Sequence, residues 1–187
     1  MTVLNGHLYA SGYDEGAVYR YDGEKWEHLG VLPEATQTYG FTIHEGSLYV
    51  SEWPNAHVFR LGANDQWELV GRLGEELESM PLIVHNGKMY SGTLPLGEVY
   101  RYDGGETLTQ VGRLDHTPDV KYRRVWSMAI YNGRMFAGTL PSGRVHSISV
   151  GKSTSYDHVL PAGWQHVVAT RDGDQLKLYV NGELVST

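Results

Sequence analysis

The chain repeats itself with a period of about 40 residues, and this repeat restricts the possible folds more than any other feature. Imperfect copies of the stretch 82–104 fill most of the sequence, and the turn glycines Gly6, Gly46, Gly87 and Gly133 stand 40, 41 and 46 residues apart. Short runs of alternating apolar and polar residues at such a period are typical of propeller blades, whereas helical repeats would show a 3.6-residue periodicity. The chain shows no such periodicity. The repeat therefore predicts an all-β protein with a β-propeller architecture.

Each period predicts four antiparallel strands joined by tight turns. An Asn-Gly or Glu-Gly pair separates the first two strands, and such pairs accept the positive φ angles of two-residue hairpin turns. The four successive strand positions cover 39–43, 80–84 and 125–130; then 8–11, 48–51, 89–92 and 135–138; then 17–21, 57–61, 98–102 and 144–149; and finally 26–29, 67–70 and 108–111. About four blades are predicted, either as a small closed ring or as part of a larger, incomplete one.

The period breaks in one inter-blade connection and again after Val150. The connection within 115–124 is five residues longer than its two counterparts. Beyond Val150 the Leu-Gly step of the fourth strand does not recur, and 164–182 instead predicts a polar hairpin that does not continue the blades. We therefore predict blades over 1–158 and a separate segment over 159–187.

Composition argues against several classes of partner. The net charge is −7 and the basic residues are spread among the repeats, which disfavours nucleic acid. No stretch approaches the ~20 apolar residues of a membrane span, so no membrane insertion is predicted. The absence of cysteine excludes disulfides and thiolate metal sites.

Two stretches resemble known families. The repeat Val-Tyr-Arg-Tyr-Asp-Gly, followed by Trp and Leu-Gly, resembles the kelch-like and sialidase-like propeller repeats of large bacterial extracellular proteins, over most of 3–150. The tail 163–169 together with 176–182 resembles the W-x-H-V-A and L-x-L-Y-V-D/N-G hairpin of laminin-G-like, concanavalin-type jelly rolls. The first resemblance implies an extracellular or cell-envelope location, and the second implies a C-terminal β-hairpin of jelly-roll type.

The resemblance to sialidases does not extend to a recognisable catalytic set. Asp22 and Gly23 are adjacent, unlike in the Ser-x-Asp-x-Gly-x-Thr-Trp box, so we interpret this stretch as a structural turn. The recurring Arg20, Arg60 and Arg101 occupy one blade position, which indicates packing or inter-blade pairing. The scattered histidines predict no zinc site. No catalytic residue, metal or cofactor is assigned.

The alternation of successive turns between the two faces of a blade supports a binding site on one of these faces. In an up-and-down blade, the turns between second and third strands share one face with the inter-blade connections. This irregular face also collects Tyr13, Asp14 and Glu15, and loops that vary on a regular scaffold are where binding groups concentrate. The candidate ligand-binding residues are Trp53, Asn55, His116, Asp119, Tyr122, Arg123 and Arg124. The alternative is that the insertion only fills a gap between blades.

These observations lead to two functional hypotheses. The first is a non-catalytic binding or scaffold module of a larger secreted protein, which contacts a glycan or a protein partner through this face. Trp53 and Tyr122 would stack on a sugar ring, and the charged residues suit an acidic or hydroxyl-rich ligand. The alternative is a fragment of a sialidase-type propeller glycosidase.

Overall fold

The protein is an all-β structure. The computed structural model describes residues 1–13, 15–149, 154–156 and 158–187, and these form eighteen strands in five antiparallel sheets. No helix occurs among these residues, and hence none that is long and apolar enough to cross a membrane. The predicted all-β class is confirmed.

Three sheets are complete four-stranded blades whose strands follow chain order. Blade 1 contains β1 (Thr2–Leu4), β2 (His7–Ser11), β3 (Ala17–Tyr21) and β4 (Trp26–Val31). Blade 2 contains β5 (Gln37–His44), β6 (Ser47–Trp53), β7 (His57–Leu61) and β8 (Trp67–Arg72). Blade 3 contains β9 (Glu78–His85), β10 (Lys88–Leu94), β11 (Glu98–Gly104) and β12 (Thr107–Arg113). Each predicted strand of these blades is present, most of them longer than predicted.

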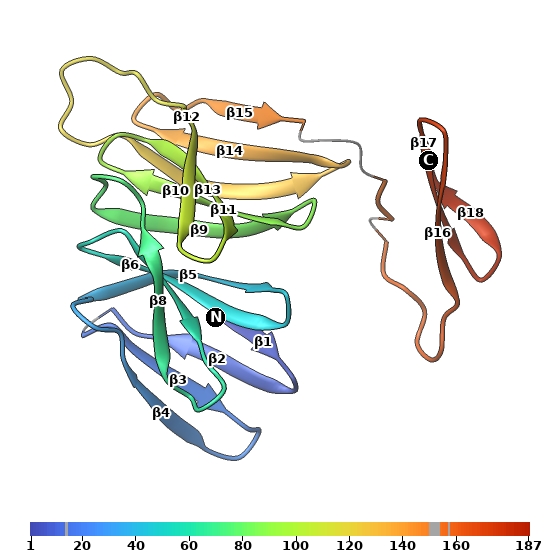
Figure 1. Cartoon of the computed structure of the whole chain (residues 1–187), viewed down its shortest axis with the longest axis horizontal. Helices are drawn as coiled ribbons and strands as arrows, with labels where there is room; N and C mark the ends of the chain where they lie inside the picture. The colour runs from blue at the N-terminus through green and yellow to red at the C-terminus, as the bar shows by residue number, and fades with distance from the viewer. Residues whose placement is uncertain (14, 150–153, 157) are drawn as a thin grey trace.

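The last two sheets have three strands each in the described part of the chain. Blade 4 contains β13 (Arg124–Tyr131), β14 (Arg134–Leu140) and β15 (Val145–Ile148). The C-terminal sheet contains β16 (Val167–Asp172), β17 (Gln175–Val180) and β18 (Glu183–Ser186), and Figure 1 shows it apart from the blades. The hairpin predicted over 164–182 is present, whereas β18 was not predicted. Trp164 is fully exposed and does not pack between blades.

The hairpin turns between first and second strands have the predicted geometry. Both central residues of each turn have positive φ, which is the condition for a type I′ turn. The pairs are Asn5-Gly6 (50° and 80°), Glu45-Gly46 (48° and 76°), Asn86-Gly87 (48° and 71°) and Asn132-Gly133 (46° and 68°). The Asp22 turn is structural too, because its carboxylate accepts the backbone N–H groups of Glu24 and Lys25 at 2.8 and 2.9 Å.

Blades stack through apolar side chains contributed by neighbouring sheets. Figure 1 shows the four blades following one another in chain order, with β9 beside both β5 and β13. At the second contact, Tyr90 and Val99 of blade 3 pack with Val125 of blade 4. The backbones come so close there that a Cβ on Gly92 would lie 2.5 Å from the Val125 side chain. Glycine at this position is therefore a packing requirement between blades.

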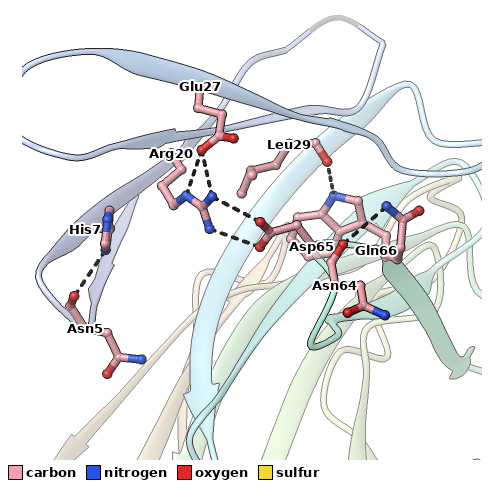
Figure 2. A network of polar contacts seen from close by, with 9 residues as sticks. Asn5, His7, Arg20, Glu27, Leu29, Asn64, Asp65 and Gln66 are labelled. Atoms are coloured by element: carbon pink, nitrogen blue, oxygen red, sulfur yellow. Dashed lines mark hydrogen bonds and ion pairs between the residues drawn. The ribbon is translucent and has the colours of Figure 1, made fainter.

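One recurring arginine joins two blades. Arg20 on β3 donates to Glu27 of its own blade at 2.7 and 3.1 Å and, through both terminal nitrogens, to Asp65 of blade 2 at 3.0 and 3.1 Å (Figure 2). The Trp67 indole of blade 2 donates to the Leu29 carbonyl of blade 1 at 3.1 Å beside this network. Forked arginine–carboxylate pairs combine charge with fixed geometry, so this contact sets the register of the two blades.

The equivalent arginines pair within their own blades. Arg60 donates to Glu68 at 2.6 Å, and Arg101 donates to Asp103 at 2.7 Å. The prediction that this position serves packing or pairing is therefore confirmed in each of the three copies, with the inter-blade form seen at Arg20.

We expect Tyr90→Phe to leave the free energy of unfolding unchanged or to raise it by about 1 kcal/mol, because the substitution removes a buried hydroxyl that gains no compensating bond. Tyr90 is buried and its hydroxyl has no hydrogen-bond partner. The equivalent position in blade 4 is Phe136, so the repeat already accommodates the apolar ring. Urea denaturation of both proteins measures the effect.

The matched control is Tyr100→Phe. The Tyr100 hydroxyl donates to Glu98 at 2.9 Å inside the core, so its removal should lower stability by about 1–2 kcal/mol. Equal losses for the two variants would contradict the assignment of an unsatisfied hydroxyl at Tyr90.

Candidate ligand-binding cavity

A cavity of about 560 Å³ opens on the irregular face of the blades, where the second strands end. This volume falls within the range of small-molecule sites. The lining residues are Tyr13, Gln37, Tyr39, Trp53, Leu77, Glu78, Leu94, Tyr122, Arg124 and Trp126. Five of these ten are aromatic, so half of the lining residues can stack on a flat ligand.

The repeat explains why these residues meet. Gln37, Glu78 and Arg124 are the first residues of β5, β9 and β13, so one strand position from each of three blades points to the same space. Tyr39 and Trp126 lie two residues further along their strands, on the same side. The scaffold thus repeats the backbone position while the side chain changes from an amide to an acid to a base.

A second repeated position forms the rim. Trp53 ends β6 and Leu94 ends β10, and Tyr13 lies at the equivalent place just after β2. All three line the cavity. The rim therefore combines two aromatic side chains with one aliphatic side chain.

Arg124 is held by aromatic rings rather than by an acid. Its guanidinium carbon lies 5.6 Å from the Tyr122 ring centre and 5.9 Å from the Trp126 ring centre. Its Nε is buried without a hydrogen-bond partner, and the described residues offer Arg124 no ion pair. The charge therefore stays available to a ligand, since cation–π contacts leave the guanidinium N–H groups free to donate.

Glu78 and Tyr39 lie in the same polar region of the wall. Burial raises the pKa of Glu78, although the nearby Arg124 charge and Tyr39 oppose the rise. Burial, followed by the negative charge of Glu78, raises the pKa of Tyr39 to about 12. Tyr39 is therefore neutral at physiological pH, and its hydroxyl donates to the Gln37 side-chain oxygen at 2.8 Å.

Three of the seven predicted ligand-binding residues line this cavity, namely Trp53, Tyr122 and Arg124. A fourth, Asn55, has a position that fits a structural role. The backbone N–H of Asn55 donates to Glu52 at 3.2 Å, and its carbonyl accepts from Arg72 at 3.1 Å. The structure thus places Asn55 in the turn behind Trp53, outside the cavity wall.

The remaining predicted residues belong to the long connection before β13. Arg123 donates from Nε to the Thr117 carbonyl at 2.7 Å and from its backbone to Pro95 at 2.8 Å, which ties the connection to blade 3. His116 and Asp119 are exposed and do not line the cavity. The insertion therefore both packs against the blades and brings Tyr122 to the cavity. Asp14, which was expected on this face, lies outside the described residues.

Sequence reasoning missed several wall residues, chiefly Gln37, Tyr39, Glu78 and Trp126. All four lie near the start of a first strand, which the sequence analysis treated only as scaffold. Superposing the strand starts of the three copies would have identified them, because the residue type changes at this position while the strand pattern does not.

Buried carboxylates hold the second-to-third turns of three blades. In three blades, a carboxylate accepts the backbone N–H of the residue that follows the proline of the second-to-third turn. The pairs are Glu52 with Asn55 at 3.2 Å, Glu76 with Leu96 at 3.0 Å and Asp115 with Ser142 at 3.1 Å. All three carboxylates are essentially inaccessible to solvent. Among the described residues, no three His, Asp or Glu side chains gather into a group that would hold a metal ion.

A family profile and several solved structures resemble parts or most of this chain. The profile of the concanavalin A-like lectin/glucanases superfamily, Laminin_G_3, matches residues 125–187, which include blade 4 as well as the C-terminal sheet. This match covers about a third of the chain. No curated protein sequence matches the chain.

Three solved structures of similar shape have low sequence identity to this chain. A catalytically inactive virginiamycin B lyase from Staphylococcus aureus, solved with quinupristin, is 9% identical, with a TM-score of 0.57 over 99% of this chain and 78% of that one. A gluconolactonase from Xanthomonas campestris is 16% identical, with a TM-score of 0.59 over 96% of this chain and 71% of that one. A putative gluconolactonase is 15% identical, with a TM-score of 0.51 over 96% and 69%. At this identity the likeness concerns the fold alone, and the chain has the fold of a β-propeller.

Proposed function

We propose that the protein is a non-catalytic binding or scaffold module of a larger secreted or envelope protein, and that the cavity of the irregular face contacts a glycan or a protein partner. The observation that carries this proposal is a wall of five aromatic side chains around Gln37, Glu78 and Arg124. Aromatic faces stack on the apolar faces of sugar rings, and the three polar groups supply donors and acceptors for hydroxyls and carboxylates.

Arg124 favours an acidic or hydroxyl-rich ligand over an apolar one. Its guanidinium has a fork of donors that suits a carboxylate, and it forms no ion pair among the described residues, although Glu78 lies close enough to feel its charge. The resemblance of the repeats to kelch-like propeller repeats, and the lectin-like family match over 125–187, support the proposal of recognition at the cell exterior.

We expect Trp53→Ala to weaken oligosaccharide binding roughly tenfold, because the substitution removes a stacking surface from the rim. Cellohexaose and hexagalacturonate serve as neutral and acidic probes in isothermal titration. Arg124→Ala should weaken binding of the acidic probe by a similar factor and spare the neutral one. The melting temperature of both variants should stay close to that of the wild type.

The control is Trp164→Ala, since Trp164 is fully exposed, does not line the cavity and lies in the segment before the C-terminal sheet. This variant should bind both probes like the wild type. Unchanged affinity combined with a large loss of stability in Trp53→Ala would show that Trp53 serves packing between blades, and the site would then be abandoned.

A sialidase-type glycosidase is the second candidate, and one observation favours it. Tyr39 and Glu78 interact inside the cavity close to Arg124, and a Tyr nucleophile is known among enzymes of this type. The described cavity wall contains one arginine, whereas the sialidase resemblance implies three convergent ones. Release of fluorophore from a 4-methylumbelliferyl sialoside by the wild type, abolished in Tyr39→Phe, would establish hydrolysis and displace the binding proposal.

A further inference from the structure

Directly behind the rim residue Trp53 lies a buried acidic side chain with an adjacent histidine. Glu52 precedes Trp53 on β6 and is completely buried, and alternation along the strand turns it away from the cavity. Its Oε1 accepts the backbone N–H of His57 at 2.7 Å and that of Asn55 at 3.2 Å. Glu52 therefore closes the turn that immediately follows Trp53.

Each of the two side chains has one buried atom without a hydrogen-bond partner. The His57 Nδ1 lies 3.5 Å from Glu52 Oε1, and neither His57 Nδ1 nor Glu52 Oε2 has a hydrogen-bond partner. Buried polar atoms are nearly always paired, and exceptions in native structures tend to have a function. A buried carboxylate with one unsatisfied oxygen, next to a half-buried imidazole, is a place where a proton can bind.

The charged groups around the pair do not fix its protonation state. Glu34 in the connection before β5 and Arg72 on β8 both act on Glu52 and His57, with opposite charges. The Phe59 ring packs edge-on against the His57 imidazole, with ring centres 5.8 Å apart. Burial thus dominates, raising the pKa of Glu52 to about 7 and lowering that of His57.

We propose that Glu52, together with His57, is a proton-binding positioning pair that sets the orientation of Trp53 at the rim of the cavity. When Glu52 is ionised, the backbone N–H groups of Asn55 and His57 donate to a full negative charge, and the turn behind Trp53 is held tightly. When Glu52 is protonated, these hydrogen bonds are weaker, because charge-assisted bonds are roughly twice as strong as neutral ones. The consequence for ligand affinity rests on the proposed function, whereas the effect on Trp53 does not.

The first test observes Trp53 without any ligand. The chain has five tryptophans, so a ¹⁵N-labelled sample gives five indole N–H signals, and Trp53→Phe identifies the signal of Trp53. We expect this signal to shift with a midpoint near pH 7 in the wild type and to be independent of pH in Glu52→Gln. In Glu76→Gln, which alters a similarly buried acid in the connection before blade 3, the shift should persist. A Trp53 signal that does not titrate in the wild type, or that still titrates in Glu52→Gln, would overturn the proposal.

The second test measures the affinity for hexagalacturonate between pH 6 and pH 8, where the sugar carboxylates stay ionised. The affinity of the wild type should rise threefold to tenfold with pH, and that of Glu52→Gln should stay constant. Binding that is identical at all pH values would overturn the positioning role and leave the proposed function intact. Absence of binding at every pH would overturn the proposed function, and the indole titration would still decide the positioning role.

Discussion

Glu52→Gln is expected to stabilise the protein by about 2 kcal/mol at pH 8 and to leave its stability nearly unchanged near pH 4. An ordinary glutamate ionises near pH 4.5, whereas burial raises the pKa of Glu52 to about 7 in the folded protein, despite the N–H groups of His57 and Asn55. The folded state therefore holds the proton more tightly than the unfolded state. The stabilisation that comes from the Glu52 proton is fully present below about pH 4.5 and is lost as the pH rises through about 7.

Glutamine keeps the oxygen that accepts the two backbone N–H groups and removes the charge. The variant should therefore lack the decline in stability that the wild type shows between pH 4.5 and 7. Chemical denaturation at several pH values measures the difference. Glu76→Gln should behave similarly, since burial is also the main cause that raises the pKa of Glu76.

Glu68→Gln is the control for this prediction, because Glu68 is exposed on β8 and pairs with Arg60 at the surface. Its effect should remain within about 0.5 kcal/mol and should show no comparable change between pH 4 and pH 8. If Glu52→Gln proves less stable than the wild type at pH 8, the ionised carboxylate must be better solvated than its burial implies.

Asp115→Asn is expected to lower stability by about 3 kcal/mol between pH 5 and 8, equivalent to a melting temperature roughly 10 °C lower. Asp115 is buried, and its Oδ1 accepts both the N–H and the hydroxyl of Thr117 at 2.9 and 2.6 Å. Its Oδ2 accepts the N–H of Ser142 in blade 4 at 3.1 Å. In Asp115→Asn the amide nitrogen would replace one of these oxygens. This nitrogen is a donor and could not accept the hydrogen bond from Thr117 or Ser142.

The pH dependence of this effect has the opposite sign to that of Glu52. Burial alone would raise the pKa of Asp115, but the hydrogen bonds from Thr117 and Ser142 outweigh it and lower the pKa. The stabilisation is therefore present above the ordinary aspartate pKa of 3.8 and declines as the pH falls below that value. Thermal melts at pH 7 and pH 3 should show the gap between variant and wild type narrowing in acid.

Asp119→Asn provides a matched control in the same connection. Asp119 is exposed, so the substitution should change stability by less than about 0.5 kcal/mol. Similar losses for both variants would mean that the connection responds to any change of charge, and the specific role of Asp115 would be lost.

Glu52 and Asp115 show why two carboxylates with the same structural task differ in protonation. Each accepts the N–H group that follows a proline turn. Asp115 has partners on both oxygens, whereas Oε2 of Glu52 has none. In Asp115 the hydrogen bonds to the charged form offset desolvation, and the pKa falls. In Glu52 one oxygen has no hydrogen bond, so desolvation dominates and the pKa rises.

The sequence alone determined the strands and turns of the blades, because these depend on local patterns. Alternating apolar residues define strands such as β7, which was predicted over 57–61 and spans His57–Leu61. The Asn-Gly and Glu-Gly pairs define the hairpins, since few other residues accept positive φ at both positions. Turn parity also placed Trp53, Tyr122 and Arg124 on one face, because successive turns of a meander must alternate.

Only the tertiary structure decided which residues of that face meet and which are buried beneath it. Arg123 and Arg124 are neighbours with the same charge, yet one ties a loop to blade 3 and the other lines the cavity. Side chains alternate along a strand, so their roles depend on the register of β13 against β14, where Arg124 pairs with Leu140. Glu52 and Asp115 are residue types that usually lie at the surface. Their burial arises from contacts between segments distant in sequence. A local pattern contains no information about such contacts, because each one forms only when neighbouring blades pack.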